Sequence, residues 1–236
     1  MDTTRKTPKI ALISSTRAVF GSMEAAFKAV FPEAEIIQIL DETLLLLFRQ
    51  DGGLSVRSRR KALQMALAAQ DAGVDGILVT CSSLSPAVDE LRAFLTVPIV
   101  KIDEPMVEHV VQSAESIALL ASAATVLKSV EPLVQSKARQ FNRKVSVRYV
   151  IKGDIWPLLQ KDPNLFYEKI GEAAEQAAKD CQAVIIAQVS MAPGRDYVSP
   201  EVRDRVYTAP EYAVRALRHV LTNPPPPEAK KRLAYR

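Results

Sequence analysis

Short runs of apolar, often β-branched residues alternate along the chain with longer stretches in which apolar positions recur every three or four residues. The first pattern is typical of buried strands and the second of amphipathic helices. Strands are predicted at residues 10–14, 35–40, 76–80, 97–102, 116–121, 145–151 and 183–187. Helices are predicted at residues 22–30, 56–72, 86–94, 105–114, 125–141, 164–180 and 210–221. This alternation indicates βαβ units and therefore an α/β fold with mainly parallel sheets.

The chain also contains an internal repeat at a fixed offset of 107 residues. Residues 10–15 (IALISS) resemble residues 117–122 (IALLAS). Residues 69–86 (AQDAGVDGILVTCSSLSP) resemble residues 176–193 (QAAKDCQAVIIAQVSMAP). Because two separated segments share one offset, the sequence favours two similar α/β halves over a chance likeness of two helix–strand units.

The repeat divides the 236 residues into two pseudo-symmetric units, each expected to be a three-layer α/β/α half. We expect the first half at residues 1–104 and the second at 105–209. The last helix, at 210–222, would return to the first half. Residues 223–236 contain four consecutive prolines followed by several cations, so we expect a mobile, basic tail there.

Charge and hydropathy exclude several functional classes. The net charge is +4, but the first nine residues carry +2 and the last fourteen carry +3, which leaves the body at −1. A near-neutral body lacks the clustered cations of a nucleic-acid-binding surface. The longest apolar run, residues 44–48, is far shorter than the roughly 18 residues of a membrane span. With no signal-peptide pattern and only two cysteines, we expect a cytoplasmic protein with reduced thiols and neither nucleic-acid nor membrane partners.

Small polar residues follow four of the predicted strands. In open parallel sheets, ligands bind beyond the carboxyl ends of the strands, where helix N-termini supply free N–H donors. A single hydroxyl at such a turn is more typical of a helix cap than of a ligand contact. Four polar loops that face one cleft, however, favour a ligand site. Hydroxyls and N–H groups suit a small carboxylate without Lys or Arg, so we expect a neutral cleft. The candidate substrate-binding residues are Ser14, Ser15, Thr16, Ser82, Ser83, Ser122, Thr125, Gln188 and Ser190.

Cys81 is the candidate catalytic residue, because it directly follows the predicted strand at 76–80. The N-terminus of the next helix can lower the pKa of a cysteine and favour the reactive thiolate. The polar neighbours Thr80 and Ser82 argue against a purely apolar environment. Cys181 precedes its strand, at the end opposite the cleft, and is expected to be structural.

Other polar residues offer weaker candidates. Asp103 and Glu104 follow a predicted strand, where a carboxylate either orients substrate or caps the next helix, and we favour the cap. His109 and His219 lie in predicted helices and are expected at the surface or between the halves. The sequence shows no glycine-rich phosphate loop, no metal-binding cysteine pair and no Ser–His–Asp arrangement, so no cofactor or metal is expected.

Four segments are each unspecific, but their order and spacing together are specific: residues 79–83 (VTCSS), 98–105 (PIVKIDEP), 117–121 with Thr125, and 185–191. In these segments the chain resembles the aspartate/glutamate/hydantoin racemase superfamily. The resemblance implies two pseudo-symmetric α/β domains, an active site in the cleft between them, and no cofactor. It also implies proton transfer alpha to a carboxylate or carbonyl, which usual members perform with one cysteine from each half on opposite faces of the substrate.

This sequence departs from that pattern at the position equivalent to Cys81, which is occupied by Gln188. An amide neither acts as a general base nor carries a proton at neutral pH. We therefore expect a cofactor-independent isomerase that acts with one cysteine on a small carboxylate-bearing substrate. A one-cysteine decarboxylase of the arylmalonate type and a cis–trans isomerase of the maleate type stay open. So does a carboxylate-binding protein without catalysis, and the apolar helices would allow a homodimer.

Overall fold

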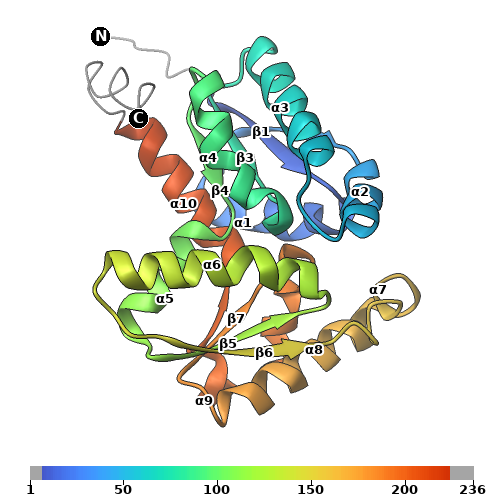
Figure 1. Ribbon diagram of the computed structural model, residues 1–236, viewed down its shortest axis with the longest axis vertical. Helices are drawn as coiled ribbons and strands as arrows, with labels where there is room; N and C mark the ends of the chain where they lie inside the picture. The colour runs from blue at the N-terminus through green and yellow to red at the C-terminus, as the bar shows by residue number, and fades with distance from the viewer. Residues whose placement is uncertain (1–6, 224–236) are drawn as a thin grey trace.

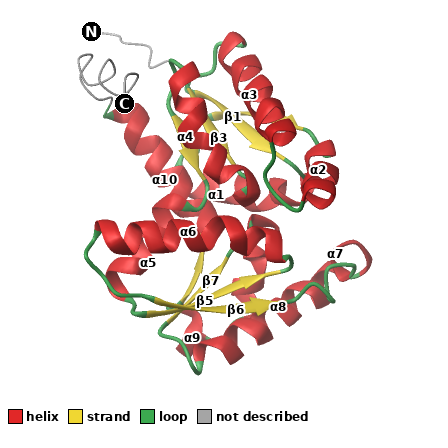
Figure 2. Cartoon of the chain, viewed as in Figure 1, coloured by secondary structure: helices red, strands yellow, loops and turns green. Residues whose placement is uncertain are grey.

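Two four-stranded parallel sheets, with helices on both faces, form the framework of the protein in a computed structural model that describes residues 7–223 (Figures 1 and 2). The first sheet has the order β2-β1-β3-β4 and the second the order β6-β5-β7-β8. The strands are β1 (Lys9–Ser14), β2 (Glu35–Leu40), β3 (Gly76–Val79), β4 (Ile99–Lys101), β5 (Ser116–Ala121), β6 (Ser146–Ile151), β7 (Ala183–Ile186) and β8 (Val206–Thr208). The expected α/β fold with parallel sheets is confirmed. The tail predicted after residue 223 lies outside the described residues.

Helices connect the strands on both sides of each sheet. The α-helices are α1 (Phe20–Val30), α2 (Thr43–Asp51), α3 (Val56–Asp71), α4 (Val88–Leu91), α5 (Glu104–Ser113), α6 (Ala124–Gln140), α7 (Leu158–Lys161), α8 (Pro163–Ala178), α9 (Pro200–Arg203) and α10 (Ala209–Thr222). Four 3-10 helices complete the described residues: η1 (Arg17–Val19), η2 (Ser82–Ala87), η3 (Arg92–Phe94) and η4 (Val189–Tyr197). None of the helices within residues 7–223 is long and apolar enough to cross a membrane.

The offset of 107 residues seen in the sequence relates the two sheets strand by strand. The bounds of β1 and β5, of β3 and β7, and of β4 and β8 each differ by this offset, as do those of α3 and α8. The pairing register repeats too, since Ala11 pairs with Ile77 and Ala118 with Val184. The second strands, β2 and β6, depart from the offset by a few residues.

The two sheets share one central apolar core. Ile10 and Leu12 of β1 belong to the same buried cluster as Ile117 and Leu119 of β5. Because side chains alternate across a strand, the intervening residues of β1 belong instead to a separate cluster beneath α3, and those of β5 to another beneath α8. The inner faces therefore join the halves, while each outer face is covered by its own helices.

The last helix of each half packs against elements other than the sheet whose strand precedes it. Helix α10 follows β8 of the second sheet but contacts α1, β3 and β4 (Figure 1). Gly76 of β3 permits this approach, because a Cβ atom there would lie 3.1 Å from Leu217 Cδ1. Helix α5 follows β4 of the first sheet and packs on α6 and α10.

The sequence pattern missed several elements, among them α2 and β8, and one predicted helix is divided in the structure. Helix α2 was not predicted, because its continuous apolar run at residues 44–48 hides the helical period. Strand β8 was not predicted, because its three residues are too few to show alternation. The helix predicted at 86–94 is divided among η2, α4 and η3, with Pro86 inside η2.

Candidate active site

A cavity of about 270 Å³ lies at the carboxyl ends of the strands of both sheets. Since β1 is paired with β3 and β5 with β7, the polar loops after these strands meet at the cavity, as expected for parallel strands. The predicted residues that line it are Ser15, Thr16, Cys81, Ser82, Ser83, Ser122, Thr125, Gln188 and Ser190. Ser14 does not line the cavity; its Oγ lies 2.8 Å from Thr80 Oγ1, and it is fully buried.

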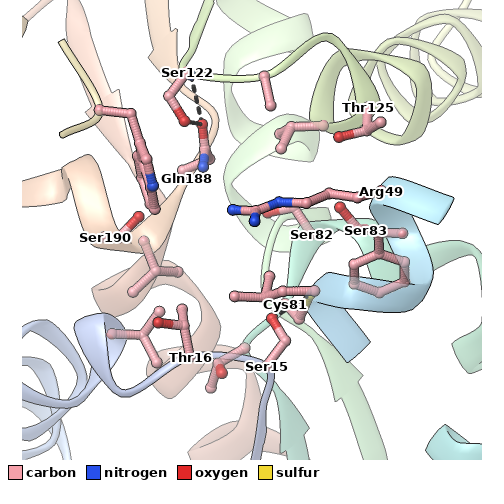
Figure 3. A pocket seen from close by; sticks show the side chains of 18 of the residues that line it. Ser15, Thr16, Arg49, Cys81, Ser82, Ser83, Ser122, Thr125, Gln188 and Ser190 are labelled. Carbon is pink, nitrogen blue, oxygen red and sulfur yellow. Dashed lines mark hydrogen bonds between the residues drawn. The ribbon is translucent and has the colours of Figure 1, made fainter. Parts of the chain in front are cut away.

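Cys81 caps the N-terminus of η2 at the wall of this cavity. The Ser15 hydroxyl donates a hydrogen bond to Cys81 Sγ at 3.1 Å, and Cys81 is 9% exposed (Figure 3). Burial raises the pKa of the Cys81 thiol, and hydrogen bonds from Ser15 and from the Leu84 and Ser83 N–H groups oppose that rise. The predicted lowering of this pKa is therefore wrong for the free site, because burial outweighs the helix N–H groups.

Gln188 occupies the equivalent place in the second half, at the N-terminus of η4. Its Oε1 accepts hydrogen bonds from Ser122 N at 2.6 Å and from Ser122 Oγ at 2.9 Å (Figure 3). The offset relates Ser15 with Cys81 to Ser122 with Gln188, so a serine holds the key residue in both halves. These bonds leave the Gln188 amide nitrogen as a donor toward the cavity.

Asp103 lies buried behind Ser82 and has a role other than the predicted one. Ser82 Oγ donates to Asp103 Oδ1 at 2.9 Å and lies 3.1 Å from the Ala187 carbonyl oxygen. Ser85 Oγ donates to Asp103 Oδ2 at 3.0 Å. Asp103 makes no side-chain cap on α5, so the predicted cap is wrong. Burial raises the pKa of Asp103 to about 6, against the lowering effects of the two hydroxyls and of Lys101.

The remaining candidates lie outside the cavity lining. Glu104 forms an ion pair with Lys137 at 2.7 Å. The His109 ring packs against Tyr212 with 5.2 Å between ring centroids, on the exposed side of α5 and α10. Cys181 is buried in the apolar cluster beneath α8, as its structural interpretation requires.

Sequence reasoning missed Arg49 and Trp156, which also line the cavity. Figure 3 shows the Arg49 guanidinium extending from α2 into the cavity. Within residues 7–223 it makes no hydrogen bond or ion pair. The cleft therefore contains an unpaired cation, and the predicted neutral cleft is wrong. The two residues are related by the 107-residue offset, but nothing in the sequence places either of them at the cleft.

The lining combines polar groups with an apolar wall. Val19, Leu45, Phe48, Val126 and Val189 contribute apolar side chains. Hydroxyls, the Gln188 amide and a guanidinium can bind a carboxylate, and the Cys81 thiol can accept or donate a proton. The described part of the chain has no group of three or more His, Cys, Asp or Glu residues that could hold a metal ion.

Comparison with known proteins agrees with this architecture. The structure is similar to allantoin racemase from Klebsiella pneumoniae (TM-score 0.70, 18% identity, covering 91% of this chain and 88% of that one). It is also similar to a glutamate racemase isoform from Bacillus anthracis (TM-score 0.72, 14% identity, 92% and 83%). An aspartate racemase homologue from Pyrococcus horikoshii OT3 gives a TM-score of 0.65 at 15% identity, over 91% and 99%.

At these identities the structural likeness establishes the fold alone. No curated protein sequence matches the chain. The family model described as Asp/Glu/Hydantoin racemase, however, matches residues 10–217. This match confirms the resemblance seen in the sequence motifs, and the chain belongs to the Asp/Glu/hydantoin racemase family.

Proposed function

We propose that this protein is a cofactor-independent isomerase that moves a proton at the carbon alpha to a carboxylate or carbonyl of a small substrate. Cys81 is its acid–base group. The observation that carries the proposal is the placement of the Cys81 thiol on the cavity wall, beside Ser15 and in the position that Gln188 takes in the other half. The cavity therefore has one proton-transfer group, Cys81, because the equivalent position of the second half holds Gln188.

Substrate binding is assigned to Arg49 and the surrounding hydroxyls. The Arg49 guanidinium has no partner within residues 7–223 and can form charge-assisted hydrogen bonds with a carboxylate. Phe48 and Trp156 offer apolar surface on the same lining. These features support a substrate with one carboxylate held by Arg49 and an apolar or planar group beside it.

In the reaction, the Cys81 thiol first releases its proton to water, and the thiolate that results takes the proton from the alpha carbon. The electron pair left behind is delocalised onto the adjacent carbonyl or carboxylate oxygen. Hydroxyl groups and the Gln188 amide stabilise the negative charge that develops there. Return of a proton from Cys81 restores the original configuration. Inversion requires a proton from the other face, where Gln188 has none to give, so water must supply it. Exchange with solvent is therefore expected to outpace inversion.

The proposal is tested with a panel of amino acids, hydantoins and hydroxy acids in deuterium oxide. We expect deuterium uptake at the alpha carbon of at least one substrate, with a slower loss of optical rotation. Cys81→Ala should abolish both signals. No uptake on any member of the panel would count against an isomerase, and ligand protection of Cys81 from alkylation without turnover would indicate a carboxylate-binding protein instead.

A second candidate is a decarboxylase, and the raised pKa of Cys81 favours it. A buried thiol that stays protonated at neutral pH is a proton donor rather than a base. Loss of carbon dioxide from a malonate-type substrate would leave an electron pair on carbon, which takes up the Cys81 proton from one face. Carbon dioxide release with formation of one enantiomer distinguishes this reaction from racemisation.

A further inference from the structure

We propose that Asp103 is a positioning residue whose gain or loss of one proton sets the direction of the Ser82 hydroxyl. In one state this hydroxyl is bonded within the first half, and in the other it is bonded to Ala187 at the end of β7. Asp103 is 1% exposed and does not line the cavity, so it acts through Ser82, which does.

Counting protons on the Ser82 hydroxyl gives the two states. Ser82 Oγ has one proton but two acceptors within reach, Asp103 Oδ1 at 2.9 Å and the Ala187 carbonyl at 3.1 Å. An ionised carboxylate is the stronger acceptor, so the proton points to Asp103. When Asp103 is protonated on Oδ1, that oxygen donates to Ser82 Oγ. The Ser82 proton is then directed to Ala187.

The second state ties the two halves together beside the reacting groups. Ser82 adjoins Cys81, and Ala187 adjoins Gln188, so the Ser82–Ala187 bond joins the two cavity walls. The arrangement exists on the Cys81 side only, because the offset places Pro210 at the position equivalent to Asp103. Its consequence for turnover rests on the proposed function, whereas the bond itself does not.

The surroundings of Asp103 allow it to titrate. Lys101 of β4 acts on the charge of Asp103, and Asp103 in turn acts on Cys81, which precedes η2. The neighbouring charged groups are Asp89 of α4, which pairs with Lys101, and Glu104 of α5, which pairs with Arg92 of η3 and Lys137 of α6. Lys101 favours the ionised form, but its Nζ is engaged by Asp89 at 2.6 Å. The negative charge of Asp103 raises the pKa of the Cys81 thiol. With a pKa of about 6, Asp103 changes charge between roughly pH 5 and 7.

Hydrogen exchange of the backbone at residues 187–191 reports the bond without requiring turnover. After correction for intrinsic exchange rates, protection in the wild type should fall roughly 3- to 10-fold as the pH rises through about 6, the effect of losing one neutral hydrogen bond. Asp103→Asn should stay protected at every pH, since its amide nitrogen donates to Ser82 permanently. Ser82→Ala should be unprotected at every pH.

Ser85→Ala is the matched control, because the Ser85 hydroxyl donates to the other carboxylate oxygen of Asp103. Its transition should persist at a higher pH, since a hydrogen bond that favours the carboxylate has been removed. Protection independent of pH in the wild type, or an equal transition in Ser82→Ala, would overturn the proposal. The two serine variants decide the question even if Asp103→Asn fails to fold.

The pH profile of deuterium uptake supplies the link to function. An inflection near pH 6 in the wild type and at a higher pH in Ser85→Ala, absent from Asp103→Asn, would support a positioning role. A protection transition without any turnover would overturn the proposed function and leave the Asp103 switch standing. Turnover without a protection transition would overturn the Asp103 switch and leave the proposed function standing.

Discussion

Cys81 and Gln188 occupy equivalent positions but offer different chemistry. Both directly precede a 3-10 helix, and both accept a hydrogen bond from a serine after the first strand of their half. The thiol exchanges protons, whereas the amide only donates and accepts hydrogen bonds. A symmetric fold therefore carries an asymmetric pair, and the face of the substrate turned to Cys81 is expected to be the one that loses its proton.

Removal of the Ser15 hydroxyl should slow the reaction of Cys81 with alkylating agents. This hydroxyl lowers the pKa of the Cys81 thiol, so Ser15→Ala raises that pKa further and leaves less thiolate at a given pH. We expect the alkylation rate at pH 8 to fall roughly 3- to 10-fold. Ser14→Ala is the control, because the buried Ser14 hydroxyl is hydrogen-bonded to Thr80 rather than to Cys81. An unchanged rate in Ser15→Ala would show that this hydrogen bond has no influence on the thiol.

Arg49 should contribute to substrate affinity more than to stability. Arg49→Met keeps the apolar stem but loses the charge, and no ion pair within residues 7–223 is broken. We expect KM for the carboxylate substrate to rise about 10-fold or more with a smaller change in kcat. Arg60→Met is the matched control, because Arg60 is exposed and lies outside the cavity lining. Equal KM values for the two variants would refute the assignment.

Strand-end residues could be predicted from the sequence because parallel strands bring their carboxyl ends to one edge. Arg49 could not, because the sequence does not show that α2 folds over the cleft. The pKa values of Cys81 and Asp103 could not be predicted either, since they depend on burial. Burial is set by the packing of η2 against α3, α4 and α6.

At the scale of elements, the position of η4 depends on its close contact with α8. A Cβ atom on Gly171 of α8 would lie 2.8 Å from Tyr197 Cβ and 3.0 Å from the Tyr197 carbonyl oxygen. A Cβ atom on Gly194 of η4 would clash with the Ile170 side chain. Because Gln188 begins η4, this packing also fixes one wall of the cavity.

Gly171→Ala should therefore destabilise the protein although alanine favours a helix. Overpacking of a close contact typically costs about 1–3 kcal/mol, which exceeds the helix propensity gained. Gly21→Ala in α1 is the control, since nothing lies within 4 Å of its added Cβ, and it should stabilise by up to about 1 kcal/mol. Urea unfolding measures both changes. A Gly171→Ala variant as stable as Gly21→Ala would contradict the account.

The sequence predicted elements well where they are long and periodic, and poorly where tertiary contacts stabilise them. Strand β8 has three residues and exists because it pairs with β7. Applying the offset of 107 residues to β4 would have located it. Helix α2 shows no polar face over residues 44–48, so its helical period is visible only in the folded protein.

At the scale of the whole molecule, the shared core couples the two halves. Side chains from the inner faces of both sheets join α5 and α10 in one apolar cluster. Helix α10 connects the second sheet to the first through Leu217, which is fully buried against Gly76. The halves are therefore expected to unfold together rather than one at a time.

Leu217→Ala tests this coupling with Trp156 as the probe. Leu217 contacts the first sheet, whereas the single tryptophan lies in the second half. Loss of the buried side chain should cost about 2–5 kcal/mol, and the urea midpoint seen by Trp156 fluorescence should fall together with that seen by circular dichroism. Leu46→Ala, at a site that is 53% exposed, should leave both midpoints nearly unchanged. An unaltered fluorescence midpoint in Leu217→Ala would show that the halves unfold independently.

Deuterium incorporation at the alpha carbon, followed by proton NMR in deuterium oxide, tests the central claim most directly. The wild type and Cys181→Ala should exchange the alpha proton at similar rates, because Cys181 lies in the core beneath α8 and outside the cavity lining. Cys81→Ala, shown by circular dichroism to be folded, should lose the exchange. Exchange that persists in Cys81→Ala would contradict the assignment of Cys81 as the group that moves the proton.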